Sequence, residues 1–245
     1  MSPRARRVAV LSDVHGNAVA LEAVLAELER EDADLVVFGG DLTWGPLPGE
    51  TLALLDGLSL PVLYVRGNAE RALLEPADEP TERERWLAAA HSDEALAWLA
   101  TFAAGVSVDI AGLGAVRFCH GSPRSDEELV TPETPVDRMR ELSAGIEERT
   151  LVTAHTHLQF DRRVGELRSV NPGSVGMPYA EQPGAYWALL GPDVELRRTE
   201  YAVEEAVARY RASGDPMAEQ MVEILEQPPT PAEVIAHAES LRFSG

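Results

Sequence analysis

The chain has 245 residues, of which 45% are hydrophobic and 25% are charged, and its formal net charge is −20. These values are typical of a soluble globular protein with a sizeable core. The acidic balance argues against duplex nucleic acid or an anionic membrane as a partner, since proteins that bind them use a basic face to neutralise phosphates.

One cysteine and the absence of long apolar runs narrow the cellular setting. Cys119 has no partner for an intrachain disulfide, and it lies in an apolar run that predicts a buried thiol. No apolar run approaches the length of a membrane span. Asp13 and His15 interrupt the first apolar run too early for a convincing signal peptide. We therefore expect a cytoplasmic protein with no membrane partner.

The first seventy residues alternate between apolar runs and amphipathic segments. The runs at 8–11, 34–38 and 62–66 predict buried strands, and helices are expected between them at 17–30 and 50–56. Strands that alternate with helices indicate right-handed crossovers and a parallel sheet.

The pattern changes after this point. Residues 69–103 favour helix with breaks at prolines, and the two apolar runs in 106–118 predict a hairpin around a glycine-bearing turn. A helix at about 134–148, a strand at 150–154 and short strands through 160–200 complete a second sheet. We therefore predict an α/β fold in which a two-sheet β-sandwich is flanked by helices in four αββα layers.

The domain organisation follows from these elements. Residues 1–200 are expected to form one domain that carries a helical insert near 69–103. Residues 201–245 are expected to form a helical extension that packs on the same domain or serves homo-oligomerisation. His237 lies in this extension without a motif around it, and a surface position is expected for it.

Side chains that can bind metals follow five of the apolar runs. Ligands of open α/β sheets bind beyond the carboxyl ends of the strands, so these side chains should converge at one edge. Each of them alone has an ordinary alternative as a turn or capping residue, but their joint placement predicts a two-metal hydrolytic centre. The predicted ligands are Asp13, His15, Asp41, Asn68, His120, His155 and His157.

The motifs around these residues resemble those of a known family. The chain is similar to the calcineurin-like metallophosphoesterase superfamily in the order of five motifs: Asp-Val-His-Gly-Asn at 13–17, Gly-Gly-Asp at 39–41, Gly-Asn at 67–68, His-Gly at 120–121 and His-Thr-His at 155–157. The segment 171–176 also resembles one found in the small bacterial and archaeal phosphodiesterases of that superfamily.

The resemblance implies two divalent cations, with Mn favoured and Fe, Ni, Zn or Mg as alternatives. It assigns one cation to Asp13, His15, Asp41 and His157. It assigns the other to Asp41, Asn68, His120 and His155. Asp41 would bridge the two, and the residues expected to be catalytic are Asp41, Asn68 and His155. Such cations lower the pKa of a shared water, so that a bridging hydroxide attacks phosphorus without a side-chain nucleophile.

One departure from the family bears on the substrate. The family motif Gly-Asn-His-Asp reads Gly67-Asn68-Ala69-Glu70 here, so a histidine thought to position phosphate or protonate the leaving oxygen is missing. A general acid contributes about 10²–10⁴-fold to rate. We therefore predict a phosphodiesterase, acting on a small phosphate ester or nucleotide. The alternatives are a phosphomonoesterase acting on nucleotides or phosphoproteins, and a catalytically weak module that binds a phospho-ligand.

Three further residues are weaker substrate-binding candidates. Asn17 begins a helix whose free amides could favour phosphate, although plain helix capping explains it equally well. His91 could replace the missing acid, with a helix-surface residue as the alternative. Arg124 could bind phosphate through two hydrogen bonds, with an ordinary surface arginine as the alternative.

Overall fold

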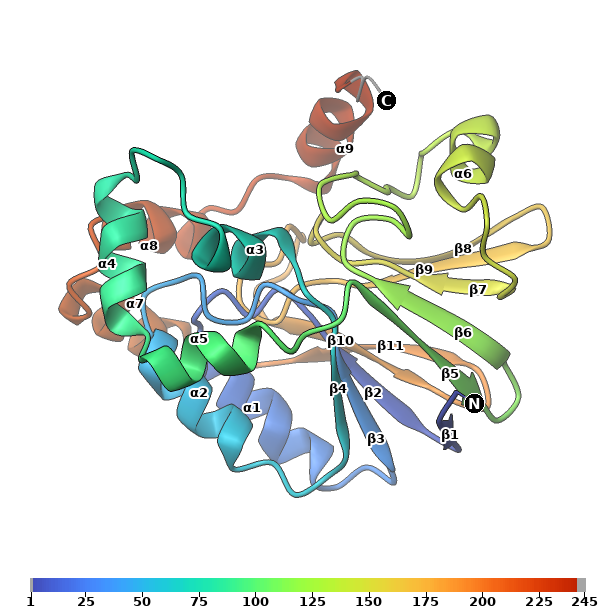
Figure 1. Cartoon of the computed structure of the whole chain (residues 1–245), viewed down its shortest axis with the longest axis horizontal. Coiled ribbons are helices and arrows are strands. Elements are labelled where there is room, and N and C mark those ends of the chain that lie inside the picture. Colours follow the sequence, from blue (N-terminus) through green and yellow to red (C-terminus); the bar gives the residue numbers. More distant parts are fainter. Residues whose placement is uncertain (1, 242–245) are drawn as a thin grey trace.

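Two β-sheets lie face to face in the structure, a computed structural model that describes residues 2–241 (Figure 1). The first is a five-stranded sheet with the order β11-β10-β2-β3-β4. Its central strands β2, β3 and β4 are parallel, while β10 pairs antiparallel with both β2 and β11. The bounds of its strands are Val8–Leu11 (β2), Leu35–Phe38 (β3), Val62–Tyr64 (β4), Ala185–Leu190 (β10) and Val194–Thr199 (β11).

The second sheet has six strands in the order β1-β5-β6-β7-β9-β8. Strands β6, β7 and β9 are parallel, and the predicted hairpin is the antiparallel pair β5–β6. The bounds of its strands are Arg4–Ala5 (β1), Gly105–Ile110 (β5), Gly114–Cys119 (β6), Thr150–Val152 (β7), Gln159–Val164 (β8) and Leu167–Pro172 (β9).

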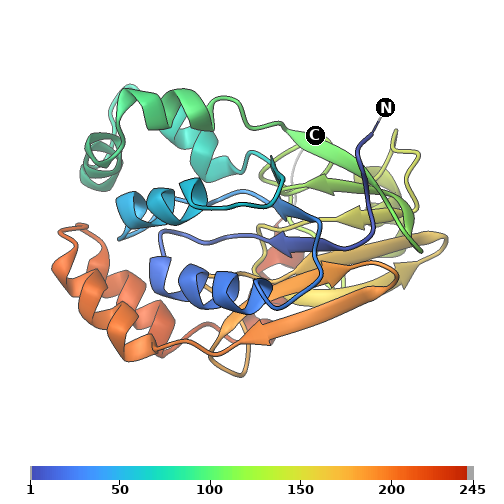
Figure 2. The same cartoon turned by 90° about the horizontal axis from the view of Figure 1, so that it is seen from below.

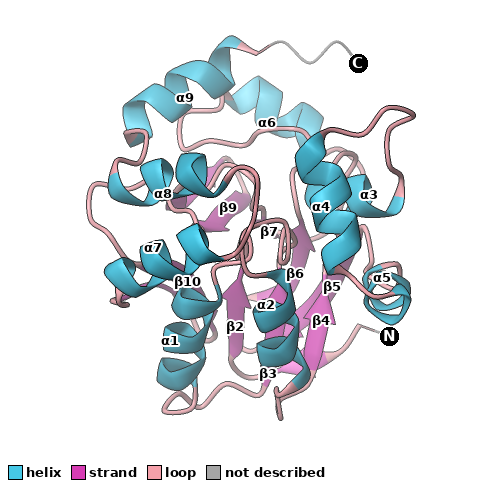
Figure 3. Ribbon diagram, turned by 90° about the vertical axis from the view of Figure 1, so that its left-hand side faces the viewer, coloured by secondary structure: helices cyan, strands magenta, loops and turns pink. Residues whose placement is uncertain are grey.

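Helices cover the outer faces of both sheets. Helices α1 (Ala18–Leu28) and α2 (Pro48–Asp56) lie on the five-stranded sheet, and α6 (Val136–Leu142) lies on the six-stranded sheet (Figures 2 and 3). This arrangement confirms the predicted four-layer αββα architecture. The prediction that all strands through 160–200 complete the second sheet is wrong, because β10 and β11 belong to the five-stranded sheet. Within residues 2–241, no helix combines the length and the apolar composition that a membrane span requires.

The central strand β2 is buried on both of its faces. Val8 and Val10 point between the sheets, where they join Phe118 and Val152 of the second sheet. Ala9 and Leu11 point the other way, toward the helices. Burial of each such aliphatic side chain contributes roughly 1.5–3 kcal/mol, so the sheets are held together and the strand ends are fixed in place.

The predicted helical segment 69–103 consists of three helices, α3 (Asn68–Leu74), α4 (Glu82–Ala90) and α5 (Asp93–Leu99). Helix α4 begins after Thr81, whose hydroxyl accepts a hydrogen bond from the Glu84 amide while the Glu84 carboxylate accepts one from the Thr81 amide. Ser92 caps α5 in a similar way through Ala95. The first break falls in the proline-bearing stretch between Leu74 and Thr81, as the sequence predicts, whereas the second break, at His91 and Ser92, contains no proline.

The last helices contact two different parts of the body. Helices α7 (Val203–Ala212) and α8 (Ala218–Glu226) pack on α1 through a shared apolar cluster that includes Tyr210. Helix α9 (Pro231–Ser240) lies toward α6, where Glu239 accepts hydrogen bonds from two threonines of the loop before α6. His237 is exposed, and residues 242–245 of the predicted extension lie outside the described residues.

One predicted element has the wrong length. The helix expected at about 134–148 is reduced to α6, which ends at Leu142. The Ser143 hydroxyl donates a hydrogen bond to the Met139 carbonyl, and Gly145 has a φ of 88°, so the chain turns away where the sequence pattern still permits helix.

Candidate metal centre

An unusual backbone conformation marks the ends of the central strands. Among residues 2–241, five residues other than glycine have φ between 48° and 64°, a left-handed conformation that costs an L-residue roughly 1–2 kcal/mol. Such strain clusters at functional sites, where the surrounding structure enforces it. The residues are Asp13, His15, Asp41, His155 and His157, all of which are predicted metal ligands.

Two loops enforce these turns on each other. The amides of Asp13 and His15 donate hydrogen bonds of 2.9 Å to the carbonyls of Gly40 and Asp41. Gly40 has a φ of 100°, and a Cβ there would lie 2.7 Å from the Gly67 nitrogen and 2.8 Å from His120 Nδ1. Glycine is therefore required at position 40, since a side chain would separate the loops that carry the ligands.

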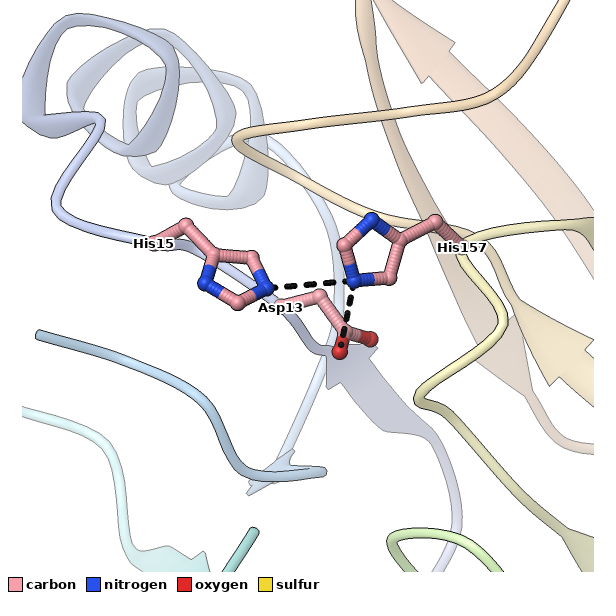
Figure 4. A group of neighbouring side chains, drawn as sticks. All are labelled: Asp13, His15 and His157. Atoms are coloured by element: carbon pink, nitrogen blue, oxygen red, sulfur yellow. Dashed lines mark hydrogen bonds and ion pairs between the residues drawn. The ribbon is translucent and has the colours of Figure 1, made fainter. Parts of the chain in front are cut away.

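The first group of donors comprises Asp13, His15 and His157 (Figure 4). The Nε2 atoms of the two histidines are 3.1 Å apart, and His157 Nε2 lies 3.3 Å from Asp13 Oδ1. The other ring nitrogen of each histidine donates to a backbone carbonyl, that of Trp44 for His15 and of Met177 for His157. These contacts fix the tautomer, so both Nε2 lone pairs point into the site.

The second group comprises Asp41, His120 and His155, with Asn68 beside them. His120 Nε2 lies 2.9 Å from Asn68 Oδ1 and 3.1 Å from His155 Nδ1. His120 Nδ1 donates to the Gly39 carbonyl at 2.8 Å, which directs its Nε2 toward the same point.

Asp41 connects the two groups through one oxygen atom. Asp41 Oδ2 lies 3.7 Å from His15 Nε2 in the first group and 3.5 Å from His120 Nε2 in the second. The other oxygen, Oδ1, accepts a hydrogen bond of 2.9 Å from the Ala69 amide. The structure thus brings all seven predicted ligands together, with Asp41 between the groups; their role as ligands stays a prediction.

The donor atoms of both groups fit divalent cations. Asp13 Oδ1 is buried without a hydrogen-bond donor in the described part of the chain. It faces the lone pair of His157 Nε2, as does His15 Nε2, and lone pairs that face one another repel unless a cation lies among them. Buried imidazole, carboxylate and amide donors are ligands of Mn, Fe, Zn and Ni.

Burial and mutual contact shift the titration of these side chains. Burial and the neighbouring His157 lower the pKa of His15 to about 4, and burial and His120 lower the pKa of His155 to about 4. Burial opposes protonation of His120, but the Asp41 carboxylate prevails and raises its pKa to about 10. The same contact holds the pKa of Asp41 well below its usual range, although burial acts to raise it. Asp41 is therefore anionic, and a cation would displace the proton from His120 Nε2.

Glu70 holds the loops of this site together through hydrogen bonds to their backbone amides. This residue was not identified from the sequence. Its fully buried carboxylate accepts hydrogen bonds of 2.7–2.9 Å from the amides of Asp41, Leu42 and Gly67. Burial and the nearby Asp41 charge raise the pKa of Glu70 to about 7. The available signal was its place in the Gly-Asn-Ala-Glu segment, where the family motif also has an acid.

Two other residues position ligands. The side-chain amide of Asn171 donates to the Ala154 carbonyl at 2.9 Å and to the Thr156 hydroxyl at 3.1 Å, which holds the loop that carries His155 and His157. The Tyr179 ring stacks on His157 with a centroid distance of 4.9 Å. No sequence pattern pointed to Tyr179.

The three weaker candidates have different outcomes. Asn17 is fully buried and caps α1 by accepting from the Ala20 amide, while its amide donates to Gly176 and Tyr201, so it offers no free atom to a substrate. Asn17 is therefore the helix cap that the sequence analysis gave as the alternative.

The position of His91 fits neither the predicted proton donor nor the alternative of a helix-surface residue. The residue is buried rather than on a helix surface, because it ends α4 and turns inward. Its ring nitrogens contact the Leu87 carbonyl at 2.7 Å and the Thr43 hydroxyl at 2.9 Å. Both nitrogens are thus engaged within the protein, and the ring has no free proton donor for a leaving group.

Arg124 is exposed and forms ion pairs with Glu128 at 2.6 Å and with Glu141 at 3.2 Å. It also lines a small cavity beside His120. Its role toward a substrate stays a prediction.

We predict that Glu70→Ala lowers the free energy of unfolding by about 3 kcal/mol, because three buried amides lose their acceptor. Glu70→Gln keeps one carbonyl oxygen and should lose less. Urea denaturation of the purified variants measures both effects. Glu82→Ala, at an exposed site on α4, is the matched control and should change stability by less than about 0.5 kcal/mol. Equal stabilities of Glu70→Ala and the control would contradict the supporting role of Glu70.

Comparisons with known proteins agree with this geometry. Residues 7–191 match the family model described as the calcineurin-like phosphoesterase superfamily domain, which confirms the resemblance inferred from the motifs. No match is found among the curated proteins.

Several solved structures are similar. A metallophosphoesterase from Sphaerobacter thermophilus is 28% identical with a TM-score of 0.75, and the match covers 91% of this chain and 99% of that one. A hypothetical protein from Pyrococcus horikoshii is 22% identical with a TM-score of 0.78 and the same coverage of 91% and 99%. A novel archaeal phosphodiesterase is 15% identical with a TM-score of 0.50, covering 78% of this chain and 99% of its own. The last two show similarity of fold alone.

Proposed function

We propose that this chain, which belongs to the calcineurin-like phosphoesterase superfamily, is a divalent-metal-dependent phosphodiesterase with a dinuclear centre. The observation that carries the proposal is the position of Asp41 Oδ2, within 3.7 Å of His15 Nε2 and 3.5 Å of His120 Nε2. A carboxylate that faces two separate sets of donors is what a bridging ligand requires.

The residues that would hold the two cations divide as the motifs predict. Asp13, His15, His157 and Asp41 would hold one, and Asp41, Asn68, His120 and His155 the other. The mixture of nitrogen and oxygen donors favours Mn, with Fe, Ni, Zn and Mg as alternatives. Two such cations supply an activated water at neutral pH and neutralise charge on a phosphoryl group.

The chain itself contributes rigidity and orientation. Backbone carbonyls fix the tautomers of His15, His120 and His157, so their Nε2 atoms stay directed into the site. We assign the catalytic role to the side chains of Asp41, Asn68 and His155. No side-chain nucleophile is needed, since the attacking group is water.

The choice of diester follows from Ala69. Its methyl group replaces the histidine of the family motif, and its amide is committed to Asp41 Oδ1. His91 does not compensate, because both of its ring nitrogens are engaged. A site that lacks the histidine of the family motif favours esters whose leaving group departs unprotonated. The same absence supports the alternative of a catalytically weak phospho-ligand-binding module, which the next experiment separates from an enzyme.

Bis(p-nitrophenyl) phosphate is expected to be hydrolysed in the presence of Mn²⁺, and chelation should abolish turnover until Mn²⁺ is restored. Asp41→Asn and His120→Ala should each lower kcat by at least about 10²-fold, because each removes a donor from the centre. His237→Ala, at an exposed site on α9, is the histidine control and should retain full activity. Full metal-dependent activity of Asp41→Asn would contradict the proposed site. Bound metal without turnover of any ester would favour the binding module.

The wild-type enzyme should prefer bis(p-nitrophenyl) phosphate over p-nitrophenyl phosphate by at least about tenfold in kcat/KM. Ala69→His restores the residue of the family motif and should reduce that preference, because a proton donor returns next to the site. The two ratios come from initial rates at saturating Mn²⁺. A wild-type enzyme that prefers the monoester would contradict the interpretation that Ala69 makes the site select diesters, and it would favour a phosphomonoesterase.

A further inference from the structure

We propose that Arg66, together with Arg71 and Arg124, binds a second anionic group of the substrate in a cavity beside the metal centre. The inference rests on the proposed function, since it places this group next to the scissile phosphate. The cavity has a volume of about 230 Å³, and His120 forms part of its wall. One residue thus belongs to both the second group of metal ligands and this cavity.

The lining of the cavity is rich in arginine, although the chain is strongly acidic. Three of its nine lining residues are arginines, against one carboxylate, that of Asp126. Arg71 and Arg124 are paired with carboxylates, so within residues 2–241 the unpaired positive charge of this cavity is that of Arg66. A volume of this size is smaller than that of a typical ligand pocket and suits a single anionic group.

The three arginines keep hydrogen-bond donors free. Within residues 2–241, the Arg66 guanidinium makes no hydrogen bond or ion pair, although the residue is only partly exposed. Arg71 uses its Nε and one terminal nitrogen to bind Asp126 at 2.7 Å and Glu127 at 2.6 Å. Arg124 likewise uses Nε and one terminal nitrogen, for Glu128 and Glu141. The second terminal nitrogen of each has no partner in the described part of the chain.

The ion pairs hold two guanidinium groups in fixed positions. Glu127, Glu128 and Glu141 pair with them but do not line the cavity. A planar guanidinium with a free edge binds phosphate or carboxylate oxygens through paired hydrogen bonds, and a fixed one loses little entropy in doing so.

Arg66 is the main residue of this proposal, because its guanidinium has no charged or hydrogen-bonded partner within the described residues. It precedes Gly67 and the predicted ligand Asn68 in the chain, at the end of the bridge that joins Val65 to Ala103. Its backbone amide donates to the Ala103 carbonyl at 2.7 Å, which anchors the residue at the cavity. A diester that carries a further phosphate or carboxylate is the substrate class that this arrangement recognises.

Calorimetric titration of the Mn²⁺-loaded protein tests the proposal with pairs of ligands that differ by one phosphate. Thymidine 3′,5′-bisphosphate is compared with thymidine 5′-phosphate, and ADP with AMP, because the distance between the two anions is then varied. We expect at least one doubly phosphorylated ligand to bind about tenfold more tightly than its partner, as a charge-assisted hydrogen bond allows. Arg66→Gln should reduce this ratio toward one.

Arg30→Gln is the matched control, since it removes the same charge from an exposed arginine just past the far end of α1. At 1.5 Å per residue, Arg30 lies roughly 16 Å or more along the helix from the end of α1 that is next to the metal centre. The control should keep the wild-type ratio. A ratio near one in the wild type for both pairs, or an unchanged ratio in Arg66→Gln, would overturn the proposal.

The binding ratio is independent of turnover, so the two proposals can fail separately. Hydrolysis of diesters with no effect of Arg66→Gln on the ratio would leave the phosphodiesterase intact and remove the anion site. Loss of the ratio in Arg66→Gln in a protein that hydrolyses no ester would leave an anion site and remove the enzyme.

Discussion

The site depends on the placement of the Asp41 carboxylate, because a single oxygen of this residue faces both groups of donors. That placement requires a left-handed backbone at Asp41, which is unfavourable for a residue other than glycine and is held by its surroundings. Gly40 permits the close approach of the neighbouring loop, and Glu70 binds the Asp41 amide from below. The strain at Asp41 is thus balanced by hydrogen bonds with two other segments, residues 13–15 and 67–70.

The two sheets translate core packing into the geometry of the site. Strand β2 leads to Asp13 and β3 to Asp41, while β6 and β7 of the other sheet lead to His120 and His155. The spacing between donors is therefore set by the apolar layer between the sheets, which includes Val10 and Phe118. Changes to that layer far from the site should shift donors that must converge within a few tenths of an ångström.

The sequence predicted what local patterns encode and missed what only tertiary contact creates. Apolar runs followed by Asp or His identified the strands and the converging donors, since both features are contiguous in the chain. The predicted length of α6 was wrong because the helix end depends on one side-chain hydrogen bond, from Ser143 to Met139, and on Gly145. His91 turned out to be buried through Thr43, which is 48 residues away. The contacts of Glu70 and the role proposed for Arg66 likewise depend on tertiary surroundings that no local pattern specifies.

Anomalous scattering from crystals of the Mn²⁺-loaded protein tests the bridging role of Asp41 most directly. Data collected at the manganese edge should give two peaks about 3.5–4 Å apart, the separation of a two-metal hydrolytic centre. Both peaks should contact Asp41 Oδ2, one on the side of His15 and the other on the side of His120. A single peak, or a second peak that Asp41 does not touch, would contradict the dinuclear centre on which the proposed function rests.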